Sequence, residues 1–421
     1  MKIKNRDLSY DSVMALPREE HQMPIRQSRV LAALVRLLAK KDLRETEFSF
    51  SEIGMERLPP EQPAMFLMNH SSFIDLKIAF TLLKGRRFSI VCTSDGFVGK
   101  NWIMRLLSCI PTSKFLTDVT LVMDIRYAIK SLKSSILMYP EASYSFDGTA
   151  TPLPQSLGKF LRAMRVPVVM IRTYGAFARD PLYNNLQLRK VKVSATMEYL
   201  LSPEDLKSKS VSEINDILKD HFTFDNFRWQ KENGVRIAAP FRADGLNRVL
   251  YRCPCCNTEG KMVGRGTMLK CESCGKEWEL TEFGEVKALD GKDFFTHVPD
   301  WYNWERSCVR SELEDGSYGL DIPVDIRMLV DTKCLYNVGS GRLVHSVNGF
   351  HLTGCDGKLD FSLPPLASYS LYSDYYWYEL GDMICIGDKD ALYYCFPKEG
   401  GDVVAKTRLA AEELYKISSR K

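Results

Sequence analysis

The chain has no long apolar run and little net charge. None of its 421 residues lies in an uncharged apolar stretch of about 18 residues, the length typical of a membrane-spanning helix. The first twenty residues contain no apolar segment of the kind found in a signal peptide. Lys and Arg number 57 against 53 Asp and Glu, and a formal charge of +4 is too small to indicate a nucleic-acid binder. We therefore expect a cytoplasmic protein that contacts the inner face of the membrane only peripherally.

Cysteine is plentiful, but its distribution does not indicate disulfides. Five of the 12 cysteines crowd into CPCC and CESC, and the others are scattered. In a reducing compartment this distribution indicates a metal for the cluster and ordinary burial for the remainder. The length, with 45% hydrophobic residues, is enough for two or three domains that each bury a core.

Residues 64–225 alternate between short apolar runs and amphipathic stretches. This alternation predicts an α/β domain with a largely parallel sheet and flanking helices. Residues 189–196 alternate with period two and predict a half-buried edge strand, and residues 203–222 predict a helix. The expected strands are 64–68, 88–92, 135–139 and 166–172, and the expected helices between them are 75–83, 118–134 and 155–164.

The second half of the chain differs in composition. A polar connector leads into the cysteine cluster, and an aromatic, strand-like region follows from about residue 300 and ends in an amphipathic helix. The last region is faintly similar to pleckstrin-homology (PH)-like barrels. We expect an N-terminal domain over 1–230, a linker over 231–252, a metal ribbon over 253–290 and a small β-rich domain with a C-terminal helix over 291–421.

The segment IRQSRVLAALVRLLAK predicts a basic amphipathic helix near the N-terminus. Such a helix can lie in the interface of an anionic membrane, or it can pack on the sheet with a solvated basic face, and the pattern leaves both readings open. A helical wheel places Arg26, Arg29, Arg36 and Lys40 on one face and Leu31, Leu34, Val35 and Leu38 on the other.

The stretch NHSSFID places His70 at the turn between a strand and a helix, with Asp75 in the first helical turn. A histidine oriented by a carboxylate makes a general base, and a helix start supplies N–H groups for an oxyanion. A structural alternative is that Ser72-x-x-Asp75 is a capping box and His70 a turn residue. A second acid, Glu141, follows a later strand in YPEASYS, and an apolar VPVVMI strand comes next.

In order and spacing these blocks resemble the 1-acyl-glycerol-3-phosphate acyltransferase family of glycerophospholipid acyltransferases. The resemblance covers roughly residues 25–225 and implies transfer of a fatty acyl group, from a coenzyme A or acyl-carrier-protein thioester, to a glycerolipid hydroxyl at a membrane. It implies His70 as the base that deprotonates the acceptor and Asp75 as its orienting partner. Glu141 matches the family's acceptor-site glutamate, Ser143 and Tyr144 stand in the same block as candidate substrate-binding residues, and Lys114 stands in the middle block.

The match has one informative departure. Where the family has Gly-Thr-Arg-Ser, this chain has Ala142, Ser143, Tyr144 and Ser145, so the arginine that grips an acceptor phosphate is replaced by a tyrosine. Lys114 offers only a point charge. This departure puts lysophosphatidate in doubt as the acceptor, and it leaves open an inactive, lipid-binding or membrane-binding scaffold.

The cysteine cluster has the spacing of a zinc ribbon. Cys253 and Cys256 form one CxxC, fourteen residues follow (257–270), and Cys271 and Cys274 form the second. Four thiolates hold Zn²⁺ tetrahedrally and supply folding energy to a small module, although a rubredoxin-like iron site uses the same ligands. We expect structural zinc and a bracing or protein-contact role. Nucleic-acid or protein binding as the main function is the alternative reading.

Overall fold

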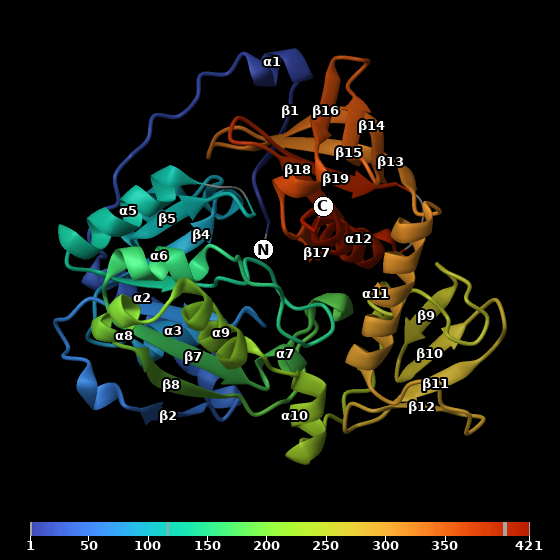
Figure 1. The fold of residues 1–421 in the computed structure, drawn as a ribbon, viewed down its shortest axis with the longest axis horizontal. Coiled ribbons are helices and arrows are strands. Elements are labelled where there is room, and N and C mark those ends of the chain that lie inside the picture. The colour runs from blue at the N-terminus through green and yellow to red at the C-terminus, as the bar shows by residue number, and fades with distance from the viewer. Residues whose placement is uncertain (1, 116–117, 399–401, 421) are drawn as a thin grey trace. The chain divides into compact units, whose positions relative to one another are not determined.

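The computed structural model describes residues 2–115, 118–398 and 402–420, and the chain divides into two compact units (Figure 1). The α/β unit comprises residues 20–180 and 188–226. The β-rich unit comprises residues 1–19, 181–187 and 227–421. The N-terminal residues thus belong with the C-terminal half, which no pattern in the sequence indicated. The division into four parts stays a prediction.

The α/β unit is built on one seven-stranded sheet. Its strand order is β2-β8-β7-β3-β6-β4-β5, in which β3 to β7 run parallel and β8 runs antiparallel to β7. β3 lies in the middle, with β7 and β6 as neighbours. The strands are β2 (Ser49–Ile53), β3 (Met65–Met68), β4 (Phe88–Thr93), β5 (Cys109–Thr112), β6 (Ser135–Met138), β7 (Val168–Tyr174) and β8 (Ser194–Leu201).

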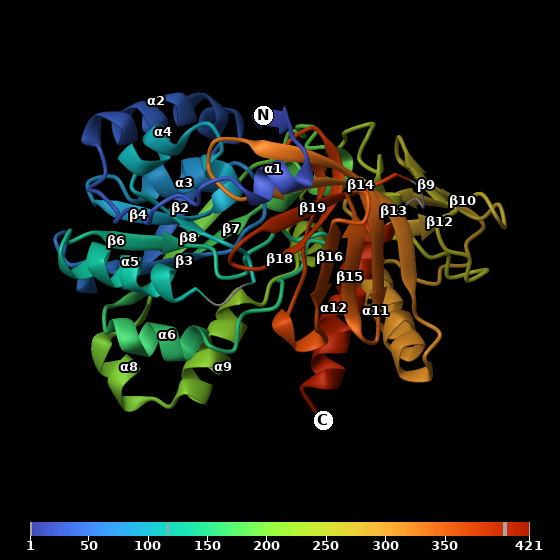
Figure 2. The ribbon, with the colours of Figure 1, turned by 90° about the horizontal axis from the view of Figure 1, so that it is seen from above.

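Helices cover both faces of this sheet, as Figure 2 shows. α2 (Arg29–Glu45), α3 (Asp75–Leu82) and α4 (Asn101–Leu106) enclose one hydrophobic core. α5 (Val119–Lys130), α6 (Leu157–Met164), α8 (Pro203–Ser208) and α9 (Val211–Phe222) enclose the other. Because both faces are buried, the central strands are continuous apolar runs such as MFLM. The shorter elements are α7 (Ala176–Arg179), η1 (Met55–Arg57) and η2 (Ser94–Phe97).

The sequence predictions for this unit hold in outline and fail at particular elements. The parallel sheet and its helices are confirmed. The expected edge strand, β8, is half-buried as predicted but lies between β7 and β2, so the edge position was wrong. The helix expected over 203–222 is two helices, because Ser202 and Ser210 each form a capping box that starts a new one.

The β-rich unit holds two antiparallel sheets. The larger has the order β16-β15-β14-β13-β19-β18-β17, with β1 (Asn5–Asp7) parallel to β14. The smaller, β12-β11-β10-β9, carries the cysteine cluster. The strands are β9 (Met262–Arg265), β10 (Met268–Cys271), β11 (Glu277–Leu280), β12 (Val286–Ala288), β13 (Leu320–Leu329), β14 (Leu335–Ser346), β15 (Gly349–Gly354), β16 (Leu359–Leu363), β17 (Tyr372–Trp377), β18 (Gly381–Gly387) and β19 (Leu392–Pro397).

Two long helices stabilise the β-rich unit. Arg306 of α11 (Val298–Asp315) pairs with Glu412 at 2.7 Å and Glu413 at 3.1 Å, both on α12 (Val403–Ser418). The two glutamates are buried, which opposes their ionisation, but the pKa of each is lowered, that of Glu412 by Arg306 and Arg408 and that of Glu413 by Lys416 and Arg306. The remaining elements are α1 (Tyr10–Met14), α10 (Asn226–Glu232), η3 (Leu182–Asn184), η4 (Leu246–Arg248) and η5 (Pro365–Ala367).

The cysteine-bearing sheet is fastened to α11 by buried contacts. The indoles of Trp278 on β11 and Trp301 on α11 pack edge to face at 5.1 Å, and both are fully buried. The Glu305 carboxylate accepts a hydrogen bond from the Arg252 amide at 2.8 Å. Residues 231–252, expected as a linker, include a packed stretch in which Leu246, Val249 and Leu250 are fully buried.

Candidate active site and metal centre

His70 lies two residues beyond the end of the central strand β3, at the carboxyl edge of the parallel strands. This is the edge at which open α/β sheets bind ligands. Asn69, before it, joins β3 to β7, because its Oδ1 accepts the Thr173 amide at 2.8 Å and its side-chain amide donates to the Thr173 carbonyl at 3.4 Å. His70 therefore starts from a fixed backbone position.

The Asp75 carboxylate holds the turn and the imidazole with a single oxygen. Its Oδ2 accepts hydrogen bonds from the Ser71 amide at 2.8 Å and the Ser72 amide at 3.0 Å, and it lies 3.2 Å from Nδ1 of His70. Asp75 is completely buried. The expected capping box at Ser72 does not form, since the helix begins at Asp75 with Ile74 as its N-cap and no side-chain cap hydrogen bond. Asp75 instead binds the amides of the turn, and its role in orienting a base stays a prediction.

The environment of His70 favours the neutral imidazole. Burial lowers the pKa of His70 below its usual value of 6.5, the Asp75 carboxylate opposes this shift, and the charge of Lys114 adds to it. A hydrogen bond from Nδ1–H to Asp75 leaves Nε2 as the unprotonated nitrogen. An oriented imidazole that is neutral near pH 7 can take a proton from a hydroxyl group.

Glu141 holds the His70 loop through the backbone. Its carboxylate accepts the His70 amide at 3.0 Å, the Thr151 amide at 2.7 Å and the Thr151 hydroxyl at 3.3 Å. Burial raises the pKa of Glu141 to about 7 against these hydrogen bonds. The Glu141 carboxylate thus accepts its hydrogen bonds from groups of the protein itself. The contact with an acceptor, which the family resemblance implies, stays a prediction.

The other expected site residues gather around the imidazole. The Tyr144 ring stacks on that of His70 with 3.9 Å between centroids, and Ser143 beside it is buried. Lys114 is near enough for its charge to act on His70. The fold therefore brings together in one unit all six residues that the sequence singled out, which are His70, Asp75, Lys114, Glu141, Ser143 and Tyr144.

A buried network behind the turn was not foreseen. The Ser72 hydroxyl donates to the Asp180 carboxylate, and the Arg179 guanidinium pairs with Asp180 at 3.0 Å and with Asp42 of α2 at 3.8 Å. Burial raises the pKa of Asp180 to about 7. Asp180 follows the turn by more than a hundred residues, so no local pattern in the sequence connected it with Ser72.

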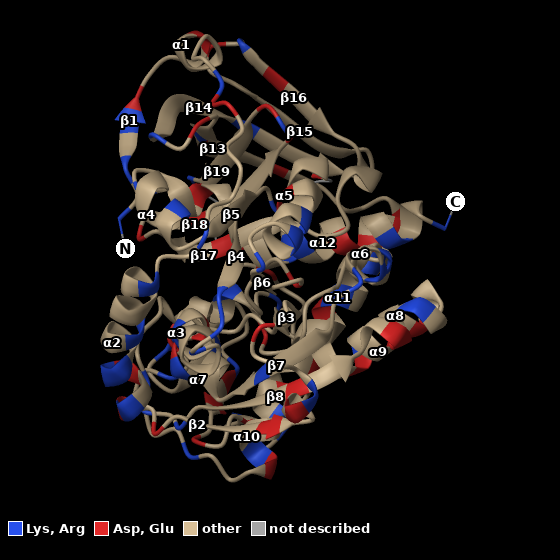
Figure 3. Ribbon diagram, turned by 90° about the vertical axis from the view of Figure 1, so that its left-hand side faces the viewer, with Lys and Arg blue, Asp and Glu red and all other residues tan. Residues whose placement is uncertain are grey.

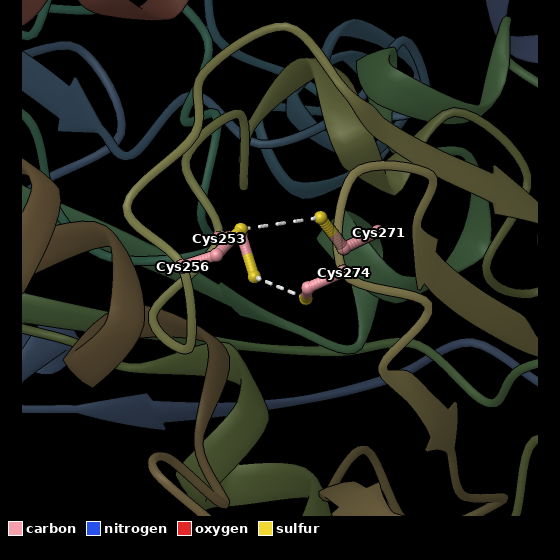
Figure 4. Close-up of side chains that lie close together, drawn as sticks. All are labelled: Cys253, Cys256, Cys271 and Cys274. Carbon is pink, nitrogen blue, oxygen red and sulfur yellow. Dashed lines mark hydrogen bonds between the residues drawn. The ribbon is translucent and has the colours of Figure 1, made fainter.

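A second candidate site lies in the β-rich unit, where two turns present four sulfurs to one another (Figure 4). The carbonyl of Cys253 accepts the Asn257 amide at 2.9 Å, and that of Cys271 accepts the Gly275 amide at 2.8 Å, so the two CxxC turns have the same form. Asn257 and Gly275 have positive φ and complete these turns.

The four sulfurs fit a tetrahedral metal ion. All lie within 4.8 Å of one another, and the Cys253–Cys274 and Cys256–Cys271 pairs are each 3.7 Å apart. A zinc ion with Zn–S bonds of about 2.3 Å requires sulfurs about 3.8 Å apart, whereas a disulfide requires about 2.05 Å. The cluster can therefore hold zinc, with Cys255 as an exposed fifth thiol outside it.

The match to a protein-family model falls within the α/β unit. Residues 50–173 match the model of the Acyltransferase family. A 1-acyl-sn-glycerol-3-phosphate acyltransferase of Chlamydomonas reinhardtii is 27% identical over 163 residues, which cover 36% of this chain and 46% of that protein. The crystal structure of the 1-acyl-sn-glycerophosphate acyltransferase PlsC from Thermotoga maritima aligns over 46% of this chain and 78% of that one, with 17% identity and a TM-score of 0.36. The chain thus spans about half the length of its curated relative.

The buried carboxyls of Glu141 and Asp180 predict a loss of stability as the pH rises. Both pKa values are raised to about 7, so between about pH 4 and pH 7 the folded chain keeps protons that the unfolded chain releases. The free energy of unfolding should then fall by up to roughly 1.4 kcal/mol per pH unit for each carboxyl. In Asp180→Asn, the decline in thermal midpoint from pH 5 to pH 7 should be shallower than in wild type.

Glu56→Gln is the matched control for this measurement, since it removes an exposed carboxyl of the same unit. It should leave the decline unchanged. Equal slopes in wild type and Asp180→Asn would mean that Asp180 is ionised throughout this range.

Proposed function

We propose, from the match of residues 50–173 to the model of the Acyltransferase family, that the protein is an O-acyltransferase. It transfers a fatty acyl group from a coenzyme A or acyl-carrier-protein thioester to a hydroxyl group of a glycerolipid. The observation that supports this most strongly is the pairing of His70 Nδ1 with the buried Asp75 carboxylate at 3.2 Å. The similar Chlamydomonas protein is named as a 1-acyl-sn-glycerol-3-phosphate acyltransferase, which agrees with this class of reaction.

The reaction proceeds by direct transfer. Nε2 of His70 takes the proton of the acceptor hydroxyl as the oxygen attacks the thioester carbonyl. The tetrahedral intermediate then collapses, the carbon–sulfur bond breaks, and the imidazolium returns the proton to the leaving thiolate. The Asp75 carboxylate stabilises the imidazolium that exists between these two steps.

The oxyanion donors are more restricted than the sequence suggested. The amides of His70, Ser71 and Ser72 already donate to Glu141 and Asp75. Ile74 donates to the Ser72 hydroxyl and Asp75 to the Ser72 carbonyl. Within residues 70–75, all of which the structure describes, the Phe73 amide is the one without such a bond. We assign the stabilisation of the oxyanion to this amide.

α2 supplies the membrane contact in this proposal. Its fully buried residues are Ala32 and Ala39, and Arg36 is half-buried. Of the four residues on the expected apolar face, Leu31 and Val35 are half-buried and Leu34 and Leu38 are exposed. Figure 3 shows the basic residues of α2 in blue. The exposed apolar residues are Val30, Leu34, Leu37 and Leu38, and the exposed basic residues are Arg29, Lys40, Lys41 and Arg44.

An exposed face of this composition fits the surface of an anionic bilayer, with leucines in the acyl boundary and basic groups at the headgroups. In the described part of the chain, no helix combines the length and apolarity that crossing a bilayer requires. Peripheral binding through α2 would bring the α/β unit to its lipid substrates.

The four cysteines hold zinc as a structural ion in this proposal. The ion would cross-link the two CxxC turns, and the buried contacts of Trp278 and Glu305 join the module to α11. These contacts favour a bracing role within the β-rich unit.

Substitution of the base should abolish turnover without unfolding the protein. His70→Ala is expected to lower kcat/KM for acceptor-dependent thiol release by about 10²- to 10⁴-fold, because the acceptor hydroxyl loses its base. In wild type, kcat/KM should rise with pH through a pKa below 6.5, since burial lowers the pKa of His70.

The control is His351→Ala, which removes a half-exposed histidine of the β-rich unit. It should keep wild-type activity. Unchanged activity in His70→Ala would contradict the assignment of the base, and a complete lack of thiol release by wild type with every donor and acceptor would favour a lipid-binding scaffold.

Vesicle binding tests the role of α2. The triple variant Leu34→Gln, Leu37→Gln and Leu38→Gln keeps good helix formers on exposed positions and removes the apolar face. Its partition onto phosphatidylglycerol-containing vesicles in co-sedimentation should fall at least about tenfold, and binding by wild type should weaken as salt rises. Leu188→Gln, at an exposed leucine outside α2, should bind like wild type. Equal binding by the triple variant would exclude α2 as the contact.

Metal analysis tests the ribbon. We expect one zinc per chain in the purified protein, and its loss in Cys271→Ser with a lowered thermal midpoint, because a single missing thiolate opens the tetrahedral site. Cys255→Ser should keep the full metal content. Iron in place of zinc, or full zinc content in Cys271→Ser, would contradict the assignment.

A further inference from the structure

The imidazole of His70 lies between two aromatic rings. Tyr139 stacks on one side with 4.2 Å between centroids and an interplanar angle of 28°, and Tyr144 stacks at 3.9 Å and 29°. Phe73 continues the stack, 5.3 Å from Tyr144. The walls of the site next to the base are therefore aromatic faces.

This stack runs from the interior to the surface. The Tyr139 hydroxyl is buried and has no hydrogen-bond partner among the described residues. At the other end, Phe73 is 48% exposed. Phe73 is therefore the end of the stack that a ligand can meet from solvent.

Charge around the base is balanced and not positive. Asp75 and Lys114 are the charged groups that shift the pKa of His70. The cations behind the turn are already paired, since Arg179 contacts Asp180 and Asp42, and Lys77 contacts Asp42. The buried carboxyls of Glu141 and Asp180 lie close enough to Asp75 for its charge to raise the pKa of each.

From this geometry we infer the class of acceptor, an inference that rests on the proposed function. The acceptor hydroxyl belongs to an uncharged polyol head, the glycerol or sugar of a neutral glycerolipid, and not to a lipid that carries a phosphate monoester. Tyr144 is the residue that determines this specificity.

The physical argument compares the two kinds of head. The C–H faces of a glycerol or sugar pack on aromatic rings without loss of charge hydration. A phosphate monoester carries close to two negative charges, and entering a site that holds the buried Asp75 carboxylate requires charged donors that replace its water. Lys114 is a single point charge, and Tyr144 provides an aromatic ring, stacked between His70 and Phe73, where a guanidinium would provide bidentate hydrogen bonds.

The test compares two acceptors with the same acyl chain, 1-monooleoylglycerol and oleoyl lysophosphatidate, in matched detergent micelles. Oleoyl-coenzyme A and oleoyl-acyl carrier protein serve as donors, thiol release gives the rate, and mass spectrometry identifies the lipid product. For wild type we expect kcat/KM for monooleoylglycerol to exceed that for lysophosphatidate at least about tenfold, the size of one lost charged hydrogen bond.

Two variants assign the preference to position 144. Tyr144→Arg should lower the ratio of kcat/KM for monooleoylglycerol to kcat/KM for lysophosphatidate by about tenfold or more, because the guanidinium offers a bidentate donor to the phosphate. Tyr144→Phe keeps the aromatic face and should retain the wild-type ratio. Circular dichroism confirms that each variant is folded.

The outcomes separate this inference from the proposed function. Rapid transfer to lysophosphatidate with little to monooleoylglycerol would overturn the inference and leave the acyltransferase intact. An unchanged ratio in Tyr144→Arg would remove Tyr144 as the specificity determinant. No transfer to either acceptor, or to mixed membrane lipids, would overturn the proposed function and the inference with it.

Discussion

The hydrogen bonds to one buried oxygen, Oδ2 of Asp75, hold the candidate active site together. That atom receives the amides of Ser71 and Ser72 and lies beside Nδ1 of His70. A buried carboxylate is costly unless donors surround it, and the turn after β3 provides these donors. The same contacts that stabilise the charge fix the direction of the imidazole. Glu141 and Asp180 hold the loop from two other sides, through the His70 amide and the Ser72 hydroxyl.

The two units hold different sites and are stabilised by different interactions. The α/β unit contains every residue that the proposed reaction uses, on a sheet whose both faces are buried, so that the site rests on rigid elements. The β-rich unit is stabilised differently, by buried ion pairs between α11 and α12 and by a cluster of four thiols. A metal would serve this second unit, since it would cross-link the two CxxC turns of the small ribbon sheet.

The sequence predicted those features that depend on neighbouring residues. The parallel strands follow from apolar runs, the cluster of four cysteines from the CxxC spacing, and the His70–Asp75 contact from their separation across a strand-to-helix turn. It did not predict features that depend on contacts between distant segments. β2 covers β8, β1 pairs with β14, and Asp180 reaches Ser72, and none of these has a local signature. On α2, helical periodicity was correct, but it did not show that Ala32 and Ala39 are the fully buried residues and that Leu34 and Leu38 of the apolar face are exposed.

The central claim is that His70 acts as a base in direct transfer, with no acyl group held on the protein. The most direct measurement is a single-turnover experiment that follows thiol release from oleoyl-coenzyme A or oleoyl-acyl carrier protein by excess enzyme, with and without a lipid acceptor. The account predicts no burst of thiol without acceptor, no mass increase of the intact protein, and equal amounts of thiol and acylated lipid once acceptor is added. A burst close to one thiol per chain without acceptor, accompanied by an acylated protein, would contradict it.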